Sequence, residues 1–371
     1  MIKKIVCFSG AFTVLLYNTA VFAFNHNSLK IDQAHLEQTL SEKPFSEIYQ
    51  DAVAGKKEAA FQLAQHYRSG EGVPQSDKEA LKWLTRAAEQ NNPLAQLELG
   101  IRLFTGKGVT QNLTEGFSWT SQAAELNEPN AQFILGTAYV EGLGTTQDLS
   151  KAYQWLNKAS KQNQLDAQVL LAKLYMAGLG TPKDSKKALD LLLKAAELEN
   201  AEAQALLGVG YLTGKEIEQS YSKAIYWLEL AAEQDDPIAQ LTLGGMYLYG
   251  LGVNKNVSQG LALINAAALE SPEAQYLLGT TYREGIDVEK NEQLARNWLL
   301  RAAQADYAKA QLKLGLMLIK GDGGYKNNME GFSWVLKAAE QDDAKAQYAL
   351  AYLYYTGSGT SINLVESKRW L

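Results

Sequence analysis

The chain has little of the chemistry on which catalytic and metal sites usually depend. Among its 371 residues it has one cysteine, Cys7, and three histidines, the last of which is His66. Histidine-activated nucleophiles and zinc or copper sites need these side chains. We therefore expect a protein that is not an enzyme, with no catalytic residue, no bound metal and no cofactor.

Positive charge is also scarce. There are 35 lysines and arginines against 41 aspartates and glutamates, which gives a net charge of −6 at pH 7. An acidic surface disfavours nucleic acid and anionic membranes as partners. Beyond the N-terminal segment, no apolar run reaches the roughly 20 residues that a membrane-spanning helix needs. We expect no integral membrane segment in the mature chain.

Residues 1–23 have the organisation of a secretory signal peptide. Lys3 and Lys4 are followed by the apolar run Ile5–Leu16, and a cleavage motif precedes Phe24. A membrane anchor is the alternative, but the run is short for one. Cleavage would also remove Cys7, so the mature chain would contain no disulfide. We expect export, either to the periplasm or out of the cell.

Tryptophan, in contrast, is strictly periodic. All seven tryptophans are spaced by about 36 residues or twice that distance: Trp83, Trp119, Trp155, Trp227, Trp298, Trp334 and Trp370. Nine alanines share this period, and all but the first precede a glutamine: Ala59, Ala95, Ala131, Ala167, Ala203, Ala239, Ala274, Ala310 and Ala346. A repeat of this length indicates a solenoid, in which stacked units share one core.

Each unit predicts two helices joined by a glycine loop. A small residue at the sixth position, such as Gly136, predicts that a neighbouring helix approaches closely. Aromatic residues at helical spacing usually pack, so the tryptophan is expected in the core between units. A glycine ends each first helix in a left-handed cap: Gly70, Gly106, Gly142, Gly178, Gly214, Gly250, Gly285, Gly321 and Gly357. A polar residue caps each second helix: Ser76, Asn112, Asp148, Asp184, Ser220, Asn256, Asn291, Asn327 and Asn363.

Two adjacent carboxylate pairs could be mistaken for an acid–base site. Asp235 and Asp236, and likewise Asp342 and Asp343, lie in the turn before a first helix. Carboxylates in such turns cap the following helix. We therefore predict a structural role for both pairs.

The unit resembles the Sel1-like repeat family, which is related to the tetratricopeptide repeat. Residues 131–161 read AQFILGTAYVEGLGTTQDLSKAYQWLNKASK, close to the whole motif, and the resemblance covers about residues 50–371. It implies an all-α fold, an α/α solenoid in which helix-turn-helix units form a right-handed superhelix. We expect capping helices in residues 24–58 and nine repeats in residues 59–371, the last of them incomplete. Glu216 and Asp287 replace a loop glycine, and Leu191 and Leu263 replace a tryptophan, so the middle of the array is irregular.

By analogy with tetratricopeptide arrays, the seventh, tenth and eleventh positions of each unit face a concave groove. These positions vary between units, whereas the framework does not, so specificity can be encoded there. For the tenth position, packing against the adjacent helix is the alternative. Tyrosine and arginine dominate binding hot spots. The predicted partner-binding residues are Phe104, Tyr249, Arg283, Glu284, Tyr352 and Tyr355.

Two functions fit these features. The first is a secreted, monomeric, noncatalytic scaffold that binds a protein or peptide in the groove. The resemblance implies secreted bacterial proteins that engage host partners, in cell entry or vesicle trafficking. The alternative is a periplasmic protein that regulates or binds components of cell-wall metabolism, with groove aromatics stacking on sugars.

Overall fold

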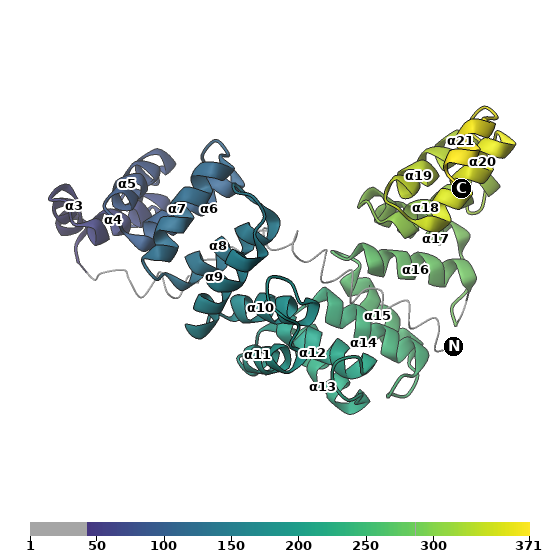
Figure 1. The fold of residues 1–371 in the computed structure, drawn as a ribbon, viewed down its shortest axis with the longest axis horizontal. Helices are drawn as coiled ribbons and strands as arrows, with labels where there is room; N and C mark the ends of the chain where they lie inside the picture. Colours follow the sequence, from purple (N-terminus) through teal and green to yellow (C-terminus); the bar gives the residue numbers. More distant parts are fainter. Residues whose placement is uncertain (1–42, 286) are drawn as a thin grey trace. The chain divides into compact units, whose positions relative to one another are not determined.

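A computed structural model describes residues 43–285 and 287–371. The predicted signal peptide and residues 24–42 of the predicted capping segment lie outside the described residues. The described part consists of helices α3 to α21 and contains no strand (Figure 1). This confirms the all-α class that the period predicts.

Helix α3 (Phe45–Val53) precedes nine helical hairpins, one for each predicted unit. The first helices of the hairpins are α4 (Lys57–Ser69), α6 (Pro93–Thr105), α8 (Pro129–Glu141), α10 (Leu165–Ala177), α12 (Ala201–Thr213), α14 (Pro237–Tyr249), α16 (Pro272–Glu284), α18 (Ala308–Lys320) and α20 (Ala344–Thr356). The second helices are α5 (Asp77–Glu89), α7 (Leu113–Glu125), α9 (Leu149–Lys161), α11 (Ser185–Glu197), α13 (Tyr221–Glu233), α15 (Val257–Ala267), α17 (Glu292–Gln304), α19 (Asn328–Glu340) and α21 (Leu364–Arg369).

The chain divides into two compact units, Met1–Ala203 and Gln204–Leu371. Within each unit, the second helix of one hairpin packs on the first helix of the next, as α7 does on α8 and α19 on α20 (Figure 1). This is the stacking by which an α/α solenoid builds a continuous core from hairpins that cannot bury their own apolar faces.

The predicted caps are confirmed in every hairpin. All nine glycines at the ends of the first helices have positive φ angles, for example 73° at Gly142 and 64° at Gly285. Each of the nine polar residues before a second helix accepts a hydrogen bond from a backbone N–H in the first turn, as Asp148 does from Lys151 at 3.0 Å. Local sequence therefore fixes both ends of the glycine loop.

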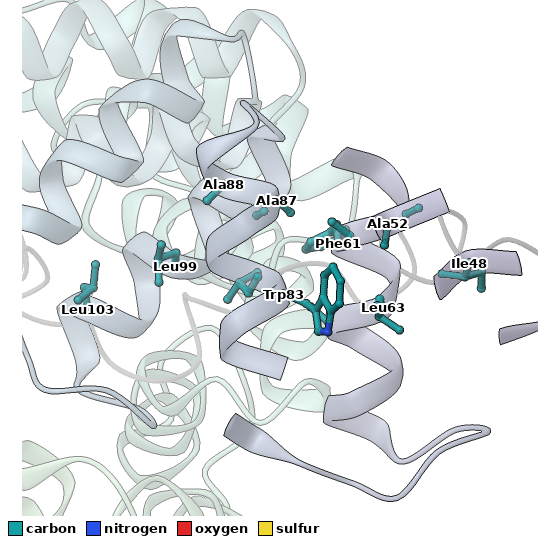
Figure 2. Close-up of a cluster of buried hydrophobic side chains, with 14 residues drawn as sticks. Ile48, Ala52, Phe61, Leu63, Trp83, Ala87, Ala88, Leu99 and Leu103 are labelled. Atoms are coloured by element: carbon teal, nitrogen blue, oxygen red, sulfur yellow. The ribbon is translucent and has the colours of Figure 1, made fainter. Parts of the chain in front are cut away.

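The tryptophan is fully buried only in the first repeat, although Trp119, Trp334 and Trp370 also pack against buried clusters. Trp83 is 4% exposed, and it lies among buried side chains of α4 and α5, with Tyr49 of α3 against its ring at 5.9 Å (Figure 2). The other six tryptophans are half-buried. Basic side chains lie over several of these indoles, such as Lys158, whose Nζ is 3.8 Å from the ring centroid of Trp155.

The core position is the residue that follows the tryptophan. It is nearly inaccessible in eight repeats: Leu84, Thr120, Leu156, Leu192, Leu228, Ile264, Leu299 and Val335. This residue faces the small sixth-position residue of the first helix, where the two helices are too close for an indole. The tryptophan is therefore displaced to the edge of the hairpin.

The glutamine after each opening alanine binds successive repeats together. Gln132 is 1% exposed, and its Nε2 donates to the carbonyl oxygen of Ala124 at 3.3 Å and to Oδ1 of Asn127 at 3.0 Å. Its own Oε1 accepts from Nε2 of Gln162, at the end of the second helix of the same repeat, at 2.8 Å. Gln311 makes the equivalent bond with Gln341 at 2.9 Å. Buried polar side chains are tolerated when they are paired in this way.

Candidate functional site: the stripe of the first helices

One face of each first helix carries an equivalent set of side chains in every repeat. The set comprises the residue before the opening alanine and the fourth, seventh and eleventh positions of the unit, which follow helical spacing. We call this set the first-helix stripe. Nε2 of Gln65 on α4 donates to Oε2 of Glu98 on α6 at 2.8 Å, and Lys173 on α10 pairs with Glu202 on α12. The stripes of these neighbouring first helices therefore lie side by side.

The tenth position is part of the core in three repeats. Phe104 is 4% exposed, and a Cβ added to Gly116 of α7 would lie 3.2 Å from its ring. Val140 and Leu248 are buried at the same position. The structure thus places Phe104 inside its hairpin and not on the surface for which it was predicted, because this face of the helix turns towards its neighbours.

Helix α20, the first helix of the ninth hairpin, exposes more aromatic side chains than the other first helices. Tyr348, Tyr352 and Tyr355 lie on one face of α20 and are 67%, 61% and 61% exposed. The position of Tyr348 is fully covered in earlier repeats, for example at Leu97 and Val169, which are both 0% exposed. In those repeats the next hairpin covers this face. Two of the six predicted contact residues, Tyr352 and Tyr355, are therefore accessible together.

A second accessible group lies on α14 and α16. Tyr249 is 42% exposed, and Glu284, at the same position in the next repeat, is also exposed. Burial, together with the nearby charges of Glu284 and Asp287, raises the pKa of the Tyr249 phenol. Arg283 is half-buried, and its Nη2 lies 3.7 Å from Oδ2 of Asp322 in the following loop. The structure thus brings Tyr249 and Glu284 together, while Arg283 contacts a different repeat.

A charged cluster on the stripe escaped the sequence analysis. Glu98 is 5% exposed, and its Oε1 accepts from Nη2 of Arg102 at 2.7 Å and from Nη1 of Arg68 at 3.4 Å. Together with Gln65 these side chains satisfy a buried carboxylate between the first two repeats. The spacing of four residues between Glu98 and Arg102 was a visible signal for this pair.

Glu141 lies at one of the positions predicted to face the groove, but it was not among the predicted contact residues. It is half-buried at the eleventh position of the third repeat, and its Oε1 is buried without a hydrogen-bond partner. Burial raises the pKa of this carboxyl from 4.5 to about 7. Sequence alone could not show this, because the desolvation comes from the surrounding fold.

The adjacent carboxylates have the structural role that was predicted. Asp236 accepts from the backbone N–H of Ala239 at 2.8 Å, and Asp343 from that of Ala346 at 2.9 Å. Asp235 accepts from Nε2 of Gln240 at 3.2 Å. In each pair, the second aspartate caps a first helix and the first aspartate accepts a hydrogen bond from the glutamine of that helix.

Two further features concern the described residues as a set. No group of three or more histidine, cysteine, aspartate or glutamate side chains is arranged there to hold a metal ion. Within residues 43–285 and 287–371, no helix is long and apolar enough to cross a bilayer.

The comparison with known families matches the repeat along the whole array. The Sel1 repeat model matches nine consecutive segments: residues 57–92, 93–128, 129–164, 165–200, 201–236, 237–271, 272–307, 308–343 and 344–371. Each segment contains one of the hairpins described above. No curated protein sequence matches the chain.

Two solved structures are similar over most of the chain. A protective antigen of uropathogenic Escherichia coli strains, with an SLR fold, is 27% identical with a TM-score of 0.61, over 89% of this chain and 78% of that one. A Sel1 repeat protein from Oxalobacter formigenes is 31% identical with a TM-score of 0.58, over 84% of this chain and 91% of that one. With nine matched repeats and these structural relatives, the chain belongs to the Sel1 repeat family.

Proposed function

We propose that this protein is a noncatalytic scaffold that binds a protein or peptide partner through the first-helix stripe. Sel1 repeat proteins are generally protein-interaction scaffolds. The observation that carries the proposal is the exposure of Tyr249 and Tyr352, which lie on the stripe at 42% and 61%. Tyrosine supplies a large contact area at a small entropic cost, and neither side chain is needed to close a hairpin core.

We further propose that the protein is exported as a monomer and meets a host protein. The support for export is the N-terminal pattern of Lys3, Lys4 and the apolar run Ile5–Leu16. The similarity to a protective antigen of a uropathogen supports contact with a host. Cell fractionation should recover a form that begins at Phe24 in the periplasm or the medium. Full-length protein confined to the cytoplasm would refute export.

The stripe can be tested with matched tyrosine variants. The protein serves as bait against host and bacterial extracts in separate experiments, and the captured partner is then titrated as a purified protein. The variant Tyr249→Ala with Tyr352→Ala should weaken binding at least about tenfold. The control Tyr226→Ala with Tyr325→Ala removes two tyrosines that are 57% and 93% exposed outside the stripe. Equal binding by the two variants would show that the stripe is not the binding surface.

A further inference from the structure

Helices α18 and α20, the first helices of the eighth and ninth hairpins, have an unusual charge pattern. Helix α18 has the sequence AKAQLKLGLMLIK, with three lysines and no acidic residue, and α20, AKAQYALAYLYYT, has one lysine and no acidic residue. The whole chain carries a net charge of −6. A local excess of positive charge on an acidic protein marks a surface with its own electrostatic preference.

These lysines all fall on the first-helix stripe. Lys309, Lys313 and Lys320 occupy three of the four stripe positions of α18, and Lys345 occupies the first stripe position of α20. We call these four residues the basic stripe. Ile319 of α18 packs against the hydrophobic cluster that includes Leu350 and Leu353 of α20, so the two helices are neighbours. From Lys309 to Lys320 the stripe is about 16 Å long, at 1.5 Å per residue.

Lys320 lies in the last turn of α18, where the helix dipole favours a cation, but the dipole does not explain the other exposed lysines. Lys309 and Lys345 lie in the first turns of their helices, where the helix dipole disfavours a cation. Lys309, Lys320 and Lys345 are exposed, and within the described residues they form no ion pair. On the preceding first helix, α16, the corresponding positions carry Glu273 and Glu284. The sign of the stripe thus changes abruptly between adjacent repeats.

We propose that the basic stripe, with Tyr352 and Tyr355 beside it, binds a short acidic peptide segment of the partner protein. This inference rests on the proposed scaffold function and names the chemistry of its ligand. An extended segment of about five residues spans 16 Å at about 3.3 Å per residue. Carboxylates spaced along it meet the lysines, and an apolar side chain of the segment packs on the tyrosines. Glu273 and Glu284 of α16 occupy the positions equivalent to Lys309 and Lys320, so the preceding repeat offers an acidic segment no comparable site.

A fluorescein-labelled peptide of eight residues, alternating glutamate with leucine, tests this proposal. Fluorescence anisotropy with the full chain should show saturable binding that weakens as salt is raised. The triple variant Lys309→Glu, Lys320→Glu, Lys345→Glu should bind at least about tenfold more weakly. The control Lys78→Glu, Lys326→Glu, Lys368→Glu makes the same change in net charge at exposed lysines outside the stripe. Circular dichroism should show both variants to be as helical as the parent.

Three outcomes would overturn the proposal. These are equal affinity of the two triple variants, equal affinity for a peptide that alternates glutamine with leucine, and tighter binding of a thymidine oligonucleotide than of the acidic peptide. The scaffold function is judged separately. If the acidic peptide fails to bind while Tyr249→Ala still weakens the natural partner, the scaffold stands and only the acidic ligand is refuted.

Discussion

Gly136 and Leu156 face each other across the two helices of the third hairpin. A Cβ added to Gly136 would lie 2.7 Å from Cγ of Leu156, which is 0% exposed. The same relationship joins Gly279 to Leu299, also at 2.7 Å. The recurrent glycine therefore has a specific partner, which is the residue after the tryptophan.

The variant Gly136→Ala should destabilise the protein even though alanine is the better helix former. Alanine gains about 1 kcal/mol in helix propensity, whereas overpacking a filled core costs about 1–3 kcal/mol. Ala64 and Ala172 occupy this position in other repeats, so a hairpin can open by the width of a methyl group. We expect a net loss of about 1 kcal/mol in the free energy of unfolding by urea.

Gly210→Ala is the matched control for this prediction. Gly210 also lies within a first helix, but the atom nearest to an added Cβ is Cδ1 of Ile217 at 3.3 Å. That atom is the flexible end of a side chain and can move. Gly210→Ala should therefore stabilise the protein by about 0.5–1 kcal/mol. The explanation fails if the two substitutions change stability in the same direction.

Leu156→Ala should be more destabilising than Trp155→Ala, although tryptophan is the larger side chain. Leu156 is completely buried, whereas Trp155 is half-buried with Lys158 over its ring. Removing a buried leucine costs about 2–5 kcal/mol. For the half-buried indole we expect less than about 2 kcal/mol. Urea unfolding of the two variants, followed by circular dichroism, compares them directly; the reverse order would contradict the assignment of the core position.

The sequence was sufficient for features that depend on neighbouring residues in the chain. The cap at Gly142 and the N-cap at Asp148 involve backbone groups only a few residues away, so residue type and spacing determine them. The hairpin follows from these two signals and the apolar period between them. Full burial of the tryptophan was not met in most repeats, because helical period identifies the buried side of a helix but does not rank two adjacent residues on it.

Accessibility of the site could not be predicted, because it depends on the neighbouring repeats. Phe104 and Tyr355 occupy the same position in different repeats, yet they are 4% and 61% exposed. Both were predicted as partner contacts. The packing alternative applies to Phe104, which faces Gly116 within its own hairpin, whereas Tyr355 lies with Tyr348 and Tyr352 on the exposed face of α20.

Gln132→Leu should destabilise the protein by about 1–3 kcal/mol, as expected when a buried polar group loses its partner. The substitution keeps the shape but leaves the carbonyl of Ala124 and the amides of Asn127 and Gln162 without it. Differential scanning calorimetry measures the change. Gln347→Leu is the control: Gln347 is half-buried and donates only at 3.4 and 3.3 Å, so its loss should cost less. Equal losses would exclude the bonds between repeats as the cause.

Glu141→Gln should stabilise the protein at neutral and alkaline pH and have little effect near pH 4. Burial raises the pKa of the folded carboxyl from its ordinary 4.5 to about 7. Below pH 4.5 the carboxyl is protonated in both the folded and the unfolded state, so it does not reduce the free energy of unfolding. Between pH 4.5 and about 7 the folded state holds a proton that the unfolded state has lost, so stability falls as pH rises. Above about pH 7 the folded state carries the poorly solvated charge.

The difference in urea midpoint between Glu141→Gln and the parent isolates this carboxyl, because every other titrating group is common to both proteins. The difference should grow with pH through this interval and become constant above about pH 7. Because burial is the cause of the shift, added salt should leave the pH profile of the difference unchanged, whereas a shift caused by nearby exposed charges would be screened. A difference that is the same at pH 4 and pH 8 would mean that Glu141 is solvated in the folded protein.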